Sequence, residues 1–215
     1  MPDLHGLILF IGAGILLNLT PGPDVLYIVT NSLRSGAKAG VVAALGINAG
    51  CFVHIFAAAL GVSALLAASA AAFTVLKWLG AAYLLWIGAR LLFSRVPTVA
   101  ANLRELSASQ PPMPLADVFM GGFWTNVLNP KVAIFFLAFV PQFIAPDASH
   151  KELAFIALGA IFNVNSVFVN AGWAVAAAWL ATRNTVQAGM HWLDRAAGAM
   201  FIAFGLKLAF ADNPT

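Results

Sequence analysis

The stretch Thr20-Pro21-Gly22-Pro23-Asp24 interrupts an apolar run of the sequence that extends from Leu4 to about Leu33. An α-helix cannot continue through two closely spaced prolines, because proline lacks a backbone N–H and its ring clashes with the preceding turn. We therefore predict a broken helix, Leu4–Leu19 followed by Val25–Leu33. The whole run exceeds the roughly 20 apolar residues that cross a bilayer, so the break is expected at depth in a membrane.

A second apolar run, Leu115 to about Ala145, contains a similar interruption at Asn129-Pro130-Lys131 and has Pro141-Gln142 near its far end. Pro130 lies 15 residues into this run, and Pro21 lies 17 residues into the first. Proline breaks at corresponding places in two halves of a membrane protein point to the binding site of a transporter. The chain is therefore predicted to consist of two related halves that meet at the breaks.

Charged residues are scarce along the whole chain: 61% of the residues are hydrophobic and only 9% are charged, against about 25% in an ordinary soluble domain. Lipid is therefore the expected solvent. The predicted fold is an all-α integral membrane protein of about six transmembrane helices, built as two inverted three-helix repeats with proline-broken first helices. The repeats are expected at 1–93 and 115–215, with a cytoplasmic connecting loop at 94–114. The unbroken spans are expected at Ala39–Ala67, Ala71–Phe93, Glu152–Ala181 and Trp192–Phe210.

Basic residues agree with this topology, since most of them lie on one side of a six-span arrangement. The side rich in Lys and Arg is normally cytoplasmic, which places both termini outside; a five-span arrangement, which moves the N-terminus, stays open. The first side holds Arg34, Lys38, Arg90, Arg95, Arg104, Arg183 and Arg195, and the other holds Lys77, Lys151 and Lys207.

Small residues recur near the second span at the spacing that lets helices approach closely in lipid. Gly36 and Gly40 form one GxxxG pair, and Gly46 and Gly50 form another. This spacing fits both packing within one chain and a homodimer, so it predicts close helix contacts without choosing between them.

Several classes of protein are disfavoured. Cys51 is the single cysteine, which excludes an intramolecular disulfide and a cysteine zinc cluster and argues against a redox carrier with paired thiols. The chain contains no GxSxG, Walker or HExxH motif, so no enzymatic activity, cofactor or resident metal is expected, and any pumping must draw on a gradient or a separate ATPase. The basic residues are isolated at helix ends, which disfavours nucleic-acid binding.

Asp24 and Lys131 are the most informative polar residues, because each lies beside a proline break. A charge at bilayer depth costs roughly 2.5–3.5 kcal/mol on insertion scales, so such residues usually face a cavity, a partner or a pathway. Broken helices also leave free N–H groups that suit a carboxylate and free carbonyls that suit an ammonium. Together they predict a site for a zwitterion such as an amino acid. The alternatives are that Asp24 only caps its half-helix and that Lys131 only reaches to the membrane surface.

Other polar side chains lie within the predicted spans, and interhelical hydrogen bonding is the simplest role for each. His54 lies well inside a span, and because imidazole titrates near neutral pH it is a candidate proton carrier. The amides are Asn18, Asn48, Asn126, Asn129, Asn163, Asn165 and Asn170.

Taken together, these motifs resemble those of the LysE/RhtB amino-acid exporters over almost the whole chain. The first half matches at Asn18–Asp24, at Ser32–Gly36, at Ala44–Asn48 with Gly50 and His54, and at Lys77–Gly88. The second half matches at Phe123–Lys131, Phe135-Phe136 and Pro141–Phe143. The position after Pro23 is often Asn in that family and is Asp here.

The resemblance implies a secondary transporter of the bacterial cytoplasmic membrane that exports amino acids or their derivatives by alternating access, driven by the proton motive force. The expected partners are this substrate, protons and the lipid bilayer. A metal-ion transporter of the wider superfamily is the main alternative, and a purely structural membrane subunit is another. The expected substrate-binding residues are Pro21, Gly22, Pro23, Asp24, Asn48, Asn129, Pro130, Lys131, Asn163 and Asn165, and those for proton coupling are Asp24 and His54.

Overall fold

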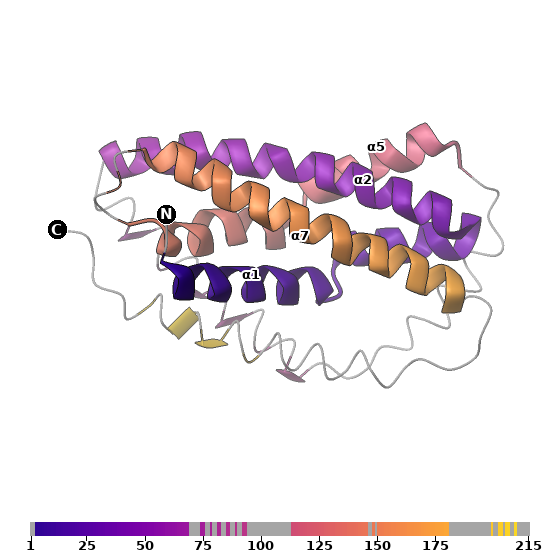
Figure 1. Cartoon of the computed structure of the whole chain (residues 1–215), viewed down its shortest axis with the longest axis horizontal. Coiled ribbons are helices and arrows are strands. Elements are labelled where there is room, and N and C mark those ends of the chain that lie inside the picture. The colour runs from indigo at the N-terminus through magenta and orange to yellow at the C-terminus, as the bar shows by residue number, and fades with distance from the viewer. Residues whose placement is uncertain are drawn as a thin grey trace.

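The computed structural model describes residues 3–68, 113–145, 148 and 150–180, with single helical positions between 74 and 93 and between 199 and 209. All of the regular structure in these ranges is helical, and the long helices lie roughly along one direction (Figure 1). By length and composition, two helical stretches in the described part could cross a membrane: Lys151–Trp179, and Pro23–Gly61, which contains a break in helical geometry at Ser35 and Gly36. A bent pair, Leu115–Val127 with Pro130–Phe143, adds a third if it is counted as one span.

Helix α1 (Leu4–Leu19) begins at Asp3, whose carboxylate accepts a hydrogen bond from the Gly6 backbone N–H at 2.8 Å. It ends at Thr20, which has an extended backbone. Helix α2 (Pro23–Ala68) then starts with a proline, a residue that tolerates the first turn because the N–H there has no partner in the helix. The predicted break is confirmed, although the helix resumes two residues earlier than Val25.

The chain reverses direction within α2, at Ser35 and Gly36, where the backbone leaves helical geometry. Gly36 has φ of +79°, a conformation that glycine adopts without the steric cost of a side chain. Beyond this point Gly40 packs directly against Ser32. The segment between the predicted helices Val25–Leu33 and Ala39–Ala67 is thus a tight hairpin that joins two antiparallel helices, 23–34 and 37–68.

The second broken segment begins with α5 (Leu115–Val127) and continues after Leu128 and Asn129 as α6 (Pro130–Ile134). A π-helical turn, η1 (Phe135–Phe139), and a 3-10 turn, η2 (Val140–Phe143), complete it. The two parts of the segment are bent by 46° at the break, as proline there predicts. Helix α7 (Lys151–Leu180) follows and agrees closely with the predicted fifth span.

The two broken segments run antiparallel with their breaks side by side. Near one end, Phe10 of α1 stacks edge-on against Phe143 of η2, with ring centroids 5.3 Å apart. At the breaks, the Lys131 ammonium donates to the backbone carbonyl of Thr20 at 3.1 Å. Toward the other end, the Tyr27 hydroxyl donates to the Val118 carbonyl at 3.0 Å. This order of contacts is what inverted halves require.

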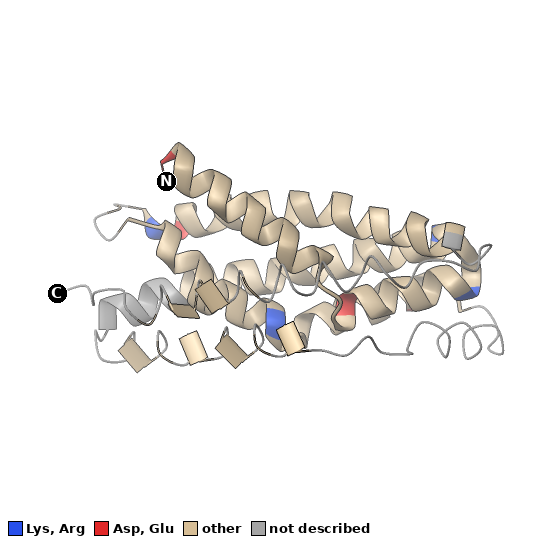
Figure 2. Ribbon diagram, turned by 90° about the horizontal axis from the view of Figure 1, so that it is seen from below, with Lys and Arg blue, Asp and Glu red and all other residues tan. Residues whose placement is uncertain are grey.

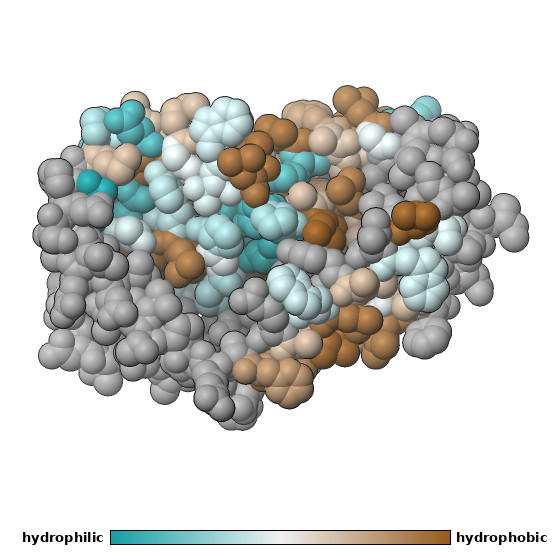
Figure 3. All heavy atoms as spheres, turned by 180° about the vertical axis from the view of Figure 1, so that it is seen from behind, coloured by the Kyte–Doolittle hydropathy of each residue, from teal (hydrophilic) through white to brown (hydrophobic). Residues whose placement is uncertain are grey.

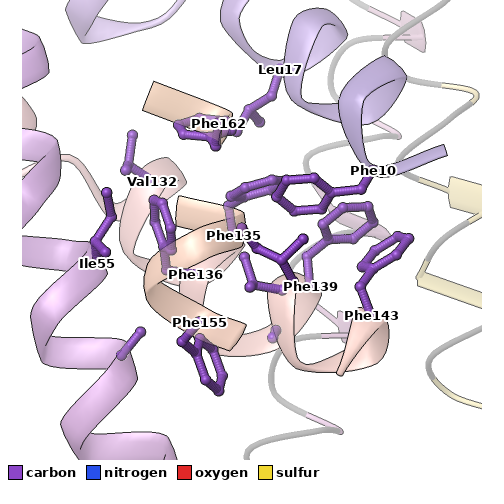
Figure 4. Packing of buried hydrophobic residues seen from close by; sticks show 14 of the residues in the cluster. Phe10, Leu17, Ile55, Val132, Phe135, Phe136, Phe139, Phe143, Phe155 and Phe162 are labelled. Carbon is purple, nitrogen blue, oxygen red and sulfur yellow. The ribbon is translucent and has the colours of Figure 1, made fainter. Parts of the chain in front are cut away.

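A cluster of phenylalanines fixes one end of this arrangement (Figure 4). The rings of Phe135 and Phe162 lie 4.7 Å apart and join η1 to α7, while Phe10 joins α1 to the same group. These side chains come from four different elements, so the cluster ties the post-break part of the second segment to both α1 and α7. Its aromatic members are Phe10, Phe135, Phe136, Phe139, Phe143, Phe155 and Phe162.

Helices α2 and α5 approach each other at glycines. A Cβ atom built on Gly46 would overlap the carbonyl oxygen of Phe119, and one on Gly50 would lie 2.5 Å from that of Phe123. From the α5 side, a Cβ on Gly122 would lie 2.5 Å from the Ala43 carbonyl. The predicted close contact at the second GxxxG pair is confirmed, and it lies within one chain.

Helix α7 runs antiparallel to the second part of α2: Gly40 lies against Ala174, and Gly159 lies against Ile55. Lys38 and Lys151 are therefore at opposite ends of the bundle, as the predicted topology requires. In Figure 2, basic residues of the described chain are visible at both ends and acidic ones at the end near the N-terminus, while a blue and a red position lie apart from each other between the ends.

The outer surface of the described helices is apolar, as expected in lipid. Leu60 and Phe168 are 70% and 73% exposed, and Trp78 and Trp86 are also exposed. On the face shown in Figure 3, hydrophilic and intermediate residues occupy the upper left and the centre, and the strongly hydrophobic residues lie mainly to the right and along the lower edge. The predicted spans Ala71–Phe93 and Trp192–Phe210 and the loop 94–114 lie largely outside the described residues, so the count of six and the division into two repeats stay predictions.

Candidate functional site

The two helix breaks meet through Lys131. Its ammonium donates to the backbone carbonyls of Leu17 and Thr20, each at 3.1 Å. These carbonyls belong to the last turn of α1, where the helix leaves acceptors without N–H partners. A lysine that begins the second half-helix of one segment therefore satisfies the end of the first half-helix of the other. The Lys131 ammonium thus contacts the end of α1, and the alternative in which the side chain only extends to the membrane surface does not account for these two hydrogen bonds.

Asp24 lies in the first turn of α2, next to this contact, and its side chain is buried. Its Oδ2 atom accepts a hydrogen bond at 2.9 Å from the side-chain amide of Asn126, which belongs to the other broken segment. Its Oδ1 atom is buried and has no hydrogen-bond partner among the described residues. The Lys131 ammonium and the Asn129 amide also lie near the carboxylate. Asp24 thus links the two broken segments, and its Oδ1 atom makes no direct hydrogen bond within the described residues.

Asn129 sets the start of α6. Its side-chain oxygen accepts from the Lys131 backbone N–H at 3.0 Å, which is the usual N-cap interaction. Its side-chain nitrogen is buried and without a partner in the described part of the chain. The same residue therefore caps the half-helix with one atom and offers a donor to the site with another.

His54 connects to this group through the backbone. Its Nε2 atom lies 2.8 Å from the carbonyl oxygen of Asn126; because a carbonyl only accepts, Nε2 must be the protonated nitrogen here. The imidazole stacks almost parallel to the ring of Phe136, with centroids 6.5 Å apart. His54 and Asp24 therefore contact the same residue, Asn126, one at its backbone and one at its side chain.

A second polar group joins α2 to α7. The Asn163 amide donates to the backbone carbonyl of Asn48 at 3.2 Å, and the Asn170 amide donates to the side-chain oxygen of Asn48 at 3.3 Å. Asn170 also donates to the Ser166 hydroxyl at 2.9 Å. Asn48 and Asn163 are thus brought together as predicted, in contact with α7 rather than with the breaks themselves.

Buried polar atoms without partners are concentrated around these two groups. Leaving such an atom unpaired costs roughly 1–3 kcal/mol, so water or a ligand is expected to bind there. Among the carboxylate and amide groups of the described residues, these acceptors are Asp24 Oδ1, Asn126 Oδ1 and Asn163 Oδ1, and the donors are Asn18 Nδ2, Asn48 Nδ2, Asn129 Nδ2 and Asn165 Nδ2. The set contains both hydrogen-bond acceptors and donors, which suits a ligand with an ammonium and a carboxylate.

Sequence reasoning missed two parts of this site. Asn126 was expected only as an interhelical hydrogen-bonding residue, yet it contacts both Asp24 and His54. The available signal was its position in the sequence: Asn126 lies only three residues before Asn129, the N-cap residue at the break. The carbonyls of Leu17 and Thr20 have no sequence signal, since every residue has one.

No three His, Cys, Asp or Glu side chains lie together in the described ranges in a way that would hold a metal ion. Within these ranges the site consists instead of amides, backbone carbonyls and one pair of opposite charges.

Comparisons with known proteins agree on one family. The family model described as LysE type translocator matches residues 15–212. A protein of Vibrio cholerae named as an uncharacterized membrane protein is 31% identical, over 97% of this chain and 98% of its own. Two efflux proteins of Salmonella typhimurium also match: one for homoserine/homoserine lactone at 32% identity, over 92% of this chain and 93% of its own, and one for leucine at 27%, over 93% and 92%. No solved structure matches.

Proposed function

Because this chain belongs to the family of LysE type translocators, we propose that it exports amino acids or amino-acid derivatives across the bacterial cytoplasmic membrane. The family expected from its motifs is thereby confirmed, and so is its nature as a multi-pass membrane protein. The names of the efflux relatives support the class of substrate.

The observation that carries the proposal is the meeting of two helix breaks of opposite direction, each with one charged residue. Asp24 has a buried carboxylate oxygen available for the ammonium of an amino acid. Lys131 and the amide nitrogen of Asn129 supply positive charge and a donor for its carboxylate. Pro21, Gly22, Pro23 and Pro130 shape the breaks, and Asn48, Asn163 and Asn165 would bind the rest of the substrate.

Export would proceed by alternating access, in which the two halves rock about the site. The antiparallel contact of the broken segments supports this proposal, because a site between inverted halves can open to either side by a similar movement. Glycine contacts and the phenylalanine cluster join the two halves away from the breaks, while Lys131 and the end of α1 are linked by hydrogen bonds to backbone carbonyls. The link at the breaks is therefore the one we expect to rearrange during transport.

Coupling to protons would use Asp24 and His54. The two residues share Asn126 as a partner, so a change of protonation at one alters the hydrogen bonding of the other. Protonation of the Asp24 carboxylate would also remove the charge that holds the substrate ammonium. Proton entry from outside would then favour substrate release, which is the order that an exporter needs.

His54→Gln is expected to flatten the dependence of export on pH. Glutamine keeps an N–H donor for the Asn126 carbonyl but does not titrate, whereas imidazole groups change protonation between about pH 5 and 8. The measurement is the initial rate of efflux from proteoliposomes across that range. His150→Gln, at an exposed histidine, is the matched control. A His54→Gln profile equal to that of the wild type would return His54 to a structural role.

The test of the proposed function is efflux from preloaded, right-side-out cells or liposomes with a panel of labelled amino acids and one divalent metal. Amino-acid efflux that collapses with a protonophore supports the proposal and identifies the substrate class. Metal flux without amino-acid flux would replace it by the cation alternative, which the ammonium of Lys131 disfavours on electrostatic grounds.

A further inference from the structure

The Lys131 side chain occupies a place where a free cation would be expected. Its ammonium lies 3.1 Å from two backbone carbonyl oxygens at the end of α1, those of Leu17 and Thr20, and is attracted by the buried Asp24 carboxylate. The chain approaches Gly22 so closely that a Cβ there would lie 3.1 Å from the Lys131 nitrogen. The break leaves room for the ammonium because Gly22 has no side chain.

Within its own helix, Lys131 lies at an electrostatically unfavourable position for a cation. Lys131 follows Pro130 in the first turn of α6, and a helix N-terminus has a partial positive charge that repels cations. The C-terminal end of α1 has the opposite partial charge and attracts them. The ammonium is therefore held by the other segment, through the kind of carbonyl oxygens that coordinate a coupling cation in transporters with broken helices.

We propose that the Lys131 ammonium is a built-in cation, which fills a monovalent-cation site formed by the Leu17 and Thr20 carbonyls, with the Asp24 carboxylate nearby as a counter-charge. The interpretation of this site as part of a transport cycle rests on the proposed export function. Because the cation is covalently attached, the wild type needs no dissolved alkali cation at this position. Removal of the side chain leaves the site vacant for a small cation from solution.

The size of the vacancy is known from the chemistry of the substitution. Lys131→Ala removes the atoms from Cγ to Nζ, which are the heavy atoms of propylammonium. That ion is therefore the best replacement, and Na⁺ is a smaller one. Lys131→Met removes the charge and still fills the space of Cγ, Cδ and Cε, leaving only the position of Nζ empty, so propylammonium does not fit.

The first experiment measures thermal unfolding of the purified full chain in detergent, with chloride salts of choline, Na⁺ and propylammonium. Propylammonium should raise the Tm of Lys131→Ala by at least about 3 °C, a shift of the size that a modest gain in stability produces in a chain this long. Wild type, Lys131→Met and the control Lys151→Ala, at the first residue of α7, should not respond.

Each other outcome decides against the proposal. A folded Lys131→Ala variant that responds to neither cation overturns it, and so does an equal response of all four proteins. If Lys131→Ala does not fold in choline, purification in propylammonium should recover it; failure to recover overturns the proposal as well. This readout uses no amino acid, so it is independent of whether the protein exports one.

The second experiment measures export in proteoliposomes. Lys131→Ala in choline should lose export. Propylammonium should raise the export rate of Lys131→Ala at least about tenfold and leave that of Lys131→Met unchanged. Normal export by Lys131→Ala in choline overturns the built-in cation. The two proposals can fail separately. If the wild type exports no amino acid but Lys131→Ala is stabilised by propylammonium in the unfolding experiment, the proposed function is wrong and the cation site is supported.

Discussion

Asp24→Ala is expected to reduce amino-acid export at least about 30-fold, since the loss of a buried carboxylate near a buried ammonium costs about 2 kcal/mol or more. The substitution removes the acceptor of the Asn126 amide and the negative charge beside Lys131. It also removes the free Oδ1 atom proposed to bind the substrate ammonium. The measurement is efflux from proteoliposomes at equal amounts of reconstituted protein.

Two further variants separate the causes of this loss. Asp24→Asn keeps an oxygen for Asn126 and removes the charge, so it should fold normally and still export at least about tenfold more slowly if the carboxylate binds an ammonium worth about 1.4 kcal/mol or more. Asp117→Ala, at an exposed aspartate in the first turn of α5, is the control and should export normally. Wild-type rates for both Asp24 variants would contradict the zwitterion site.

Gly46→Ala is expected to destabilise the protein by at least about 2 kcal/mol, because overpacking of a well-packed contact costs about 1–3 kcal/mol. The new methyl group would overlap the Phe119 carbonyl oxygen, which is backbone and cannot rotate away. Helices α2 and α5 must then separate, and the neighbouring contact at Gly50 opens with them. Thermal unfolding in detergent should show a Tm lower by about 4–8 °C.

Gly12→Ala is the matched control for this effect. A Cβ on Gly12 meets nothing within 4 Å, and alanine in a helix is favoured over glycine by roughly 0.5–1 kcal/mol. The two substitutions are chemically identical and lie in helices of the same protein, yet their effects should have opposite signs. An unchanged Tm for Gly46→Ala would mean that α2 and α5 pack less closely than the structure has them.

Local chemistry explains why the helix ends were predictable. Proline has no backbone N–H and excludes the preceding turn wherever it occurs, so Pro21, Pro23 and Pro130 marked both breaks without knowledge of their surroundings. The bend at Asn129 and the hairpin at Gly36 follow in the same way from residues beside them. The exact restart of α2, at Pro23 instead of Val25, differs only because proline is tolerated at a helix start.

The partners of the polar side chains were not predictable in this way. Lys131 donates to Leu17, 114 residues earlier, and Asn126 donates to Asp24, 102 residues earlier. A charged residue beside a helix break in the membrane needs a partner, but the sequence offers several side-chain amides and every backbone carbonyl as candidates. The choice depends on which helices pack together and at what height along their axes.

The sequence by itself determined that this chain is an all-helical membrane protein with two proline breaks at corresponding places, because composition and the absence of a proline N–H act at the level of single residues. The tertiary structure alone decided that the breaks lie side by side in antiparallel segments, and that Lys131 serves the end of α1 while Asn126 links Asp24 to His54. Those pairings depend on the close contact of α2 with α5 and on the phenylalanine cluster, which set the register of segments far apart in the chain.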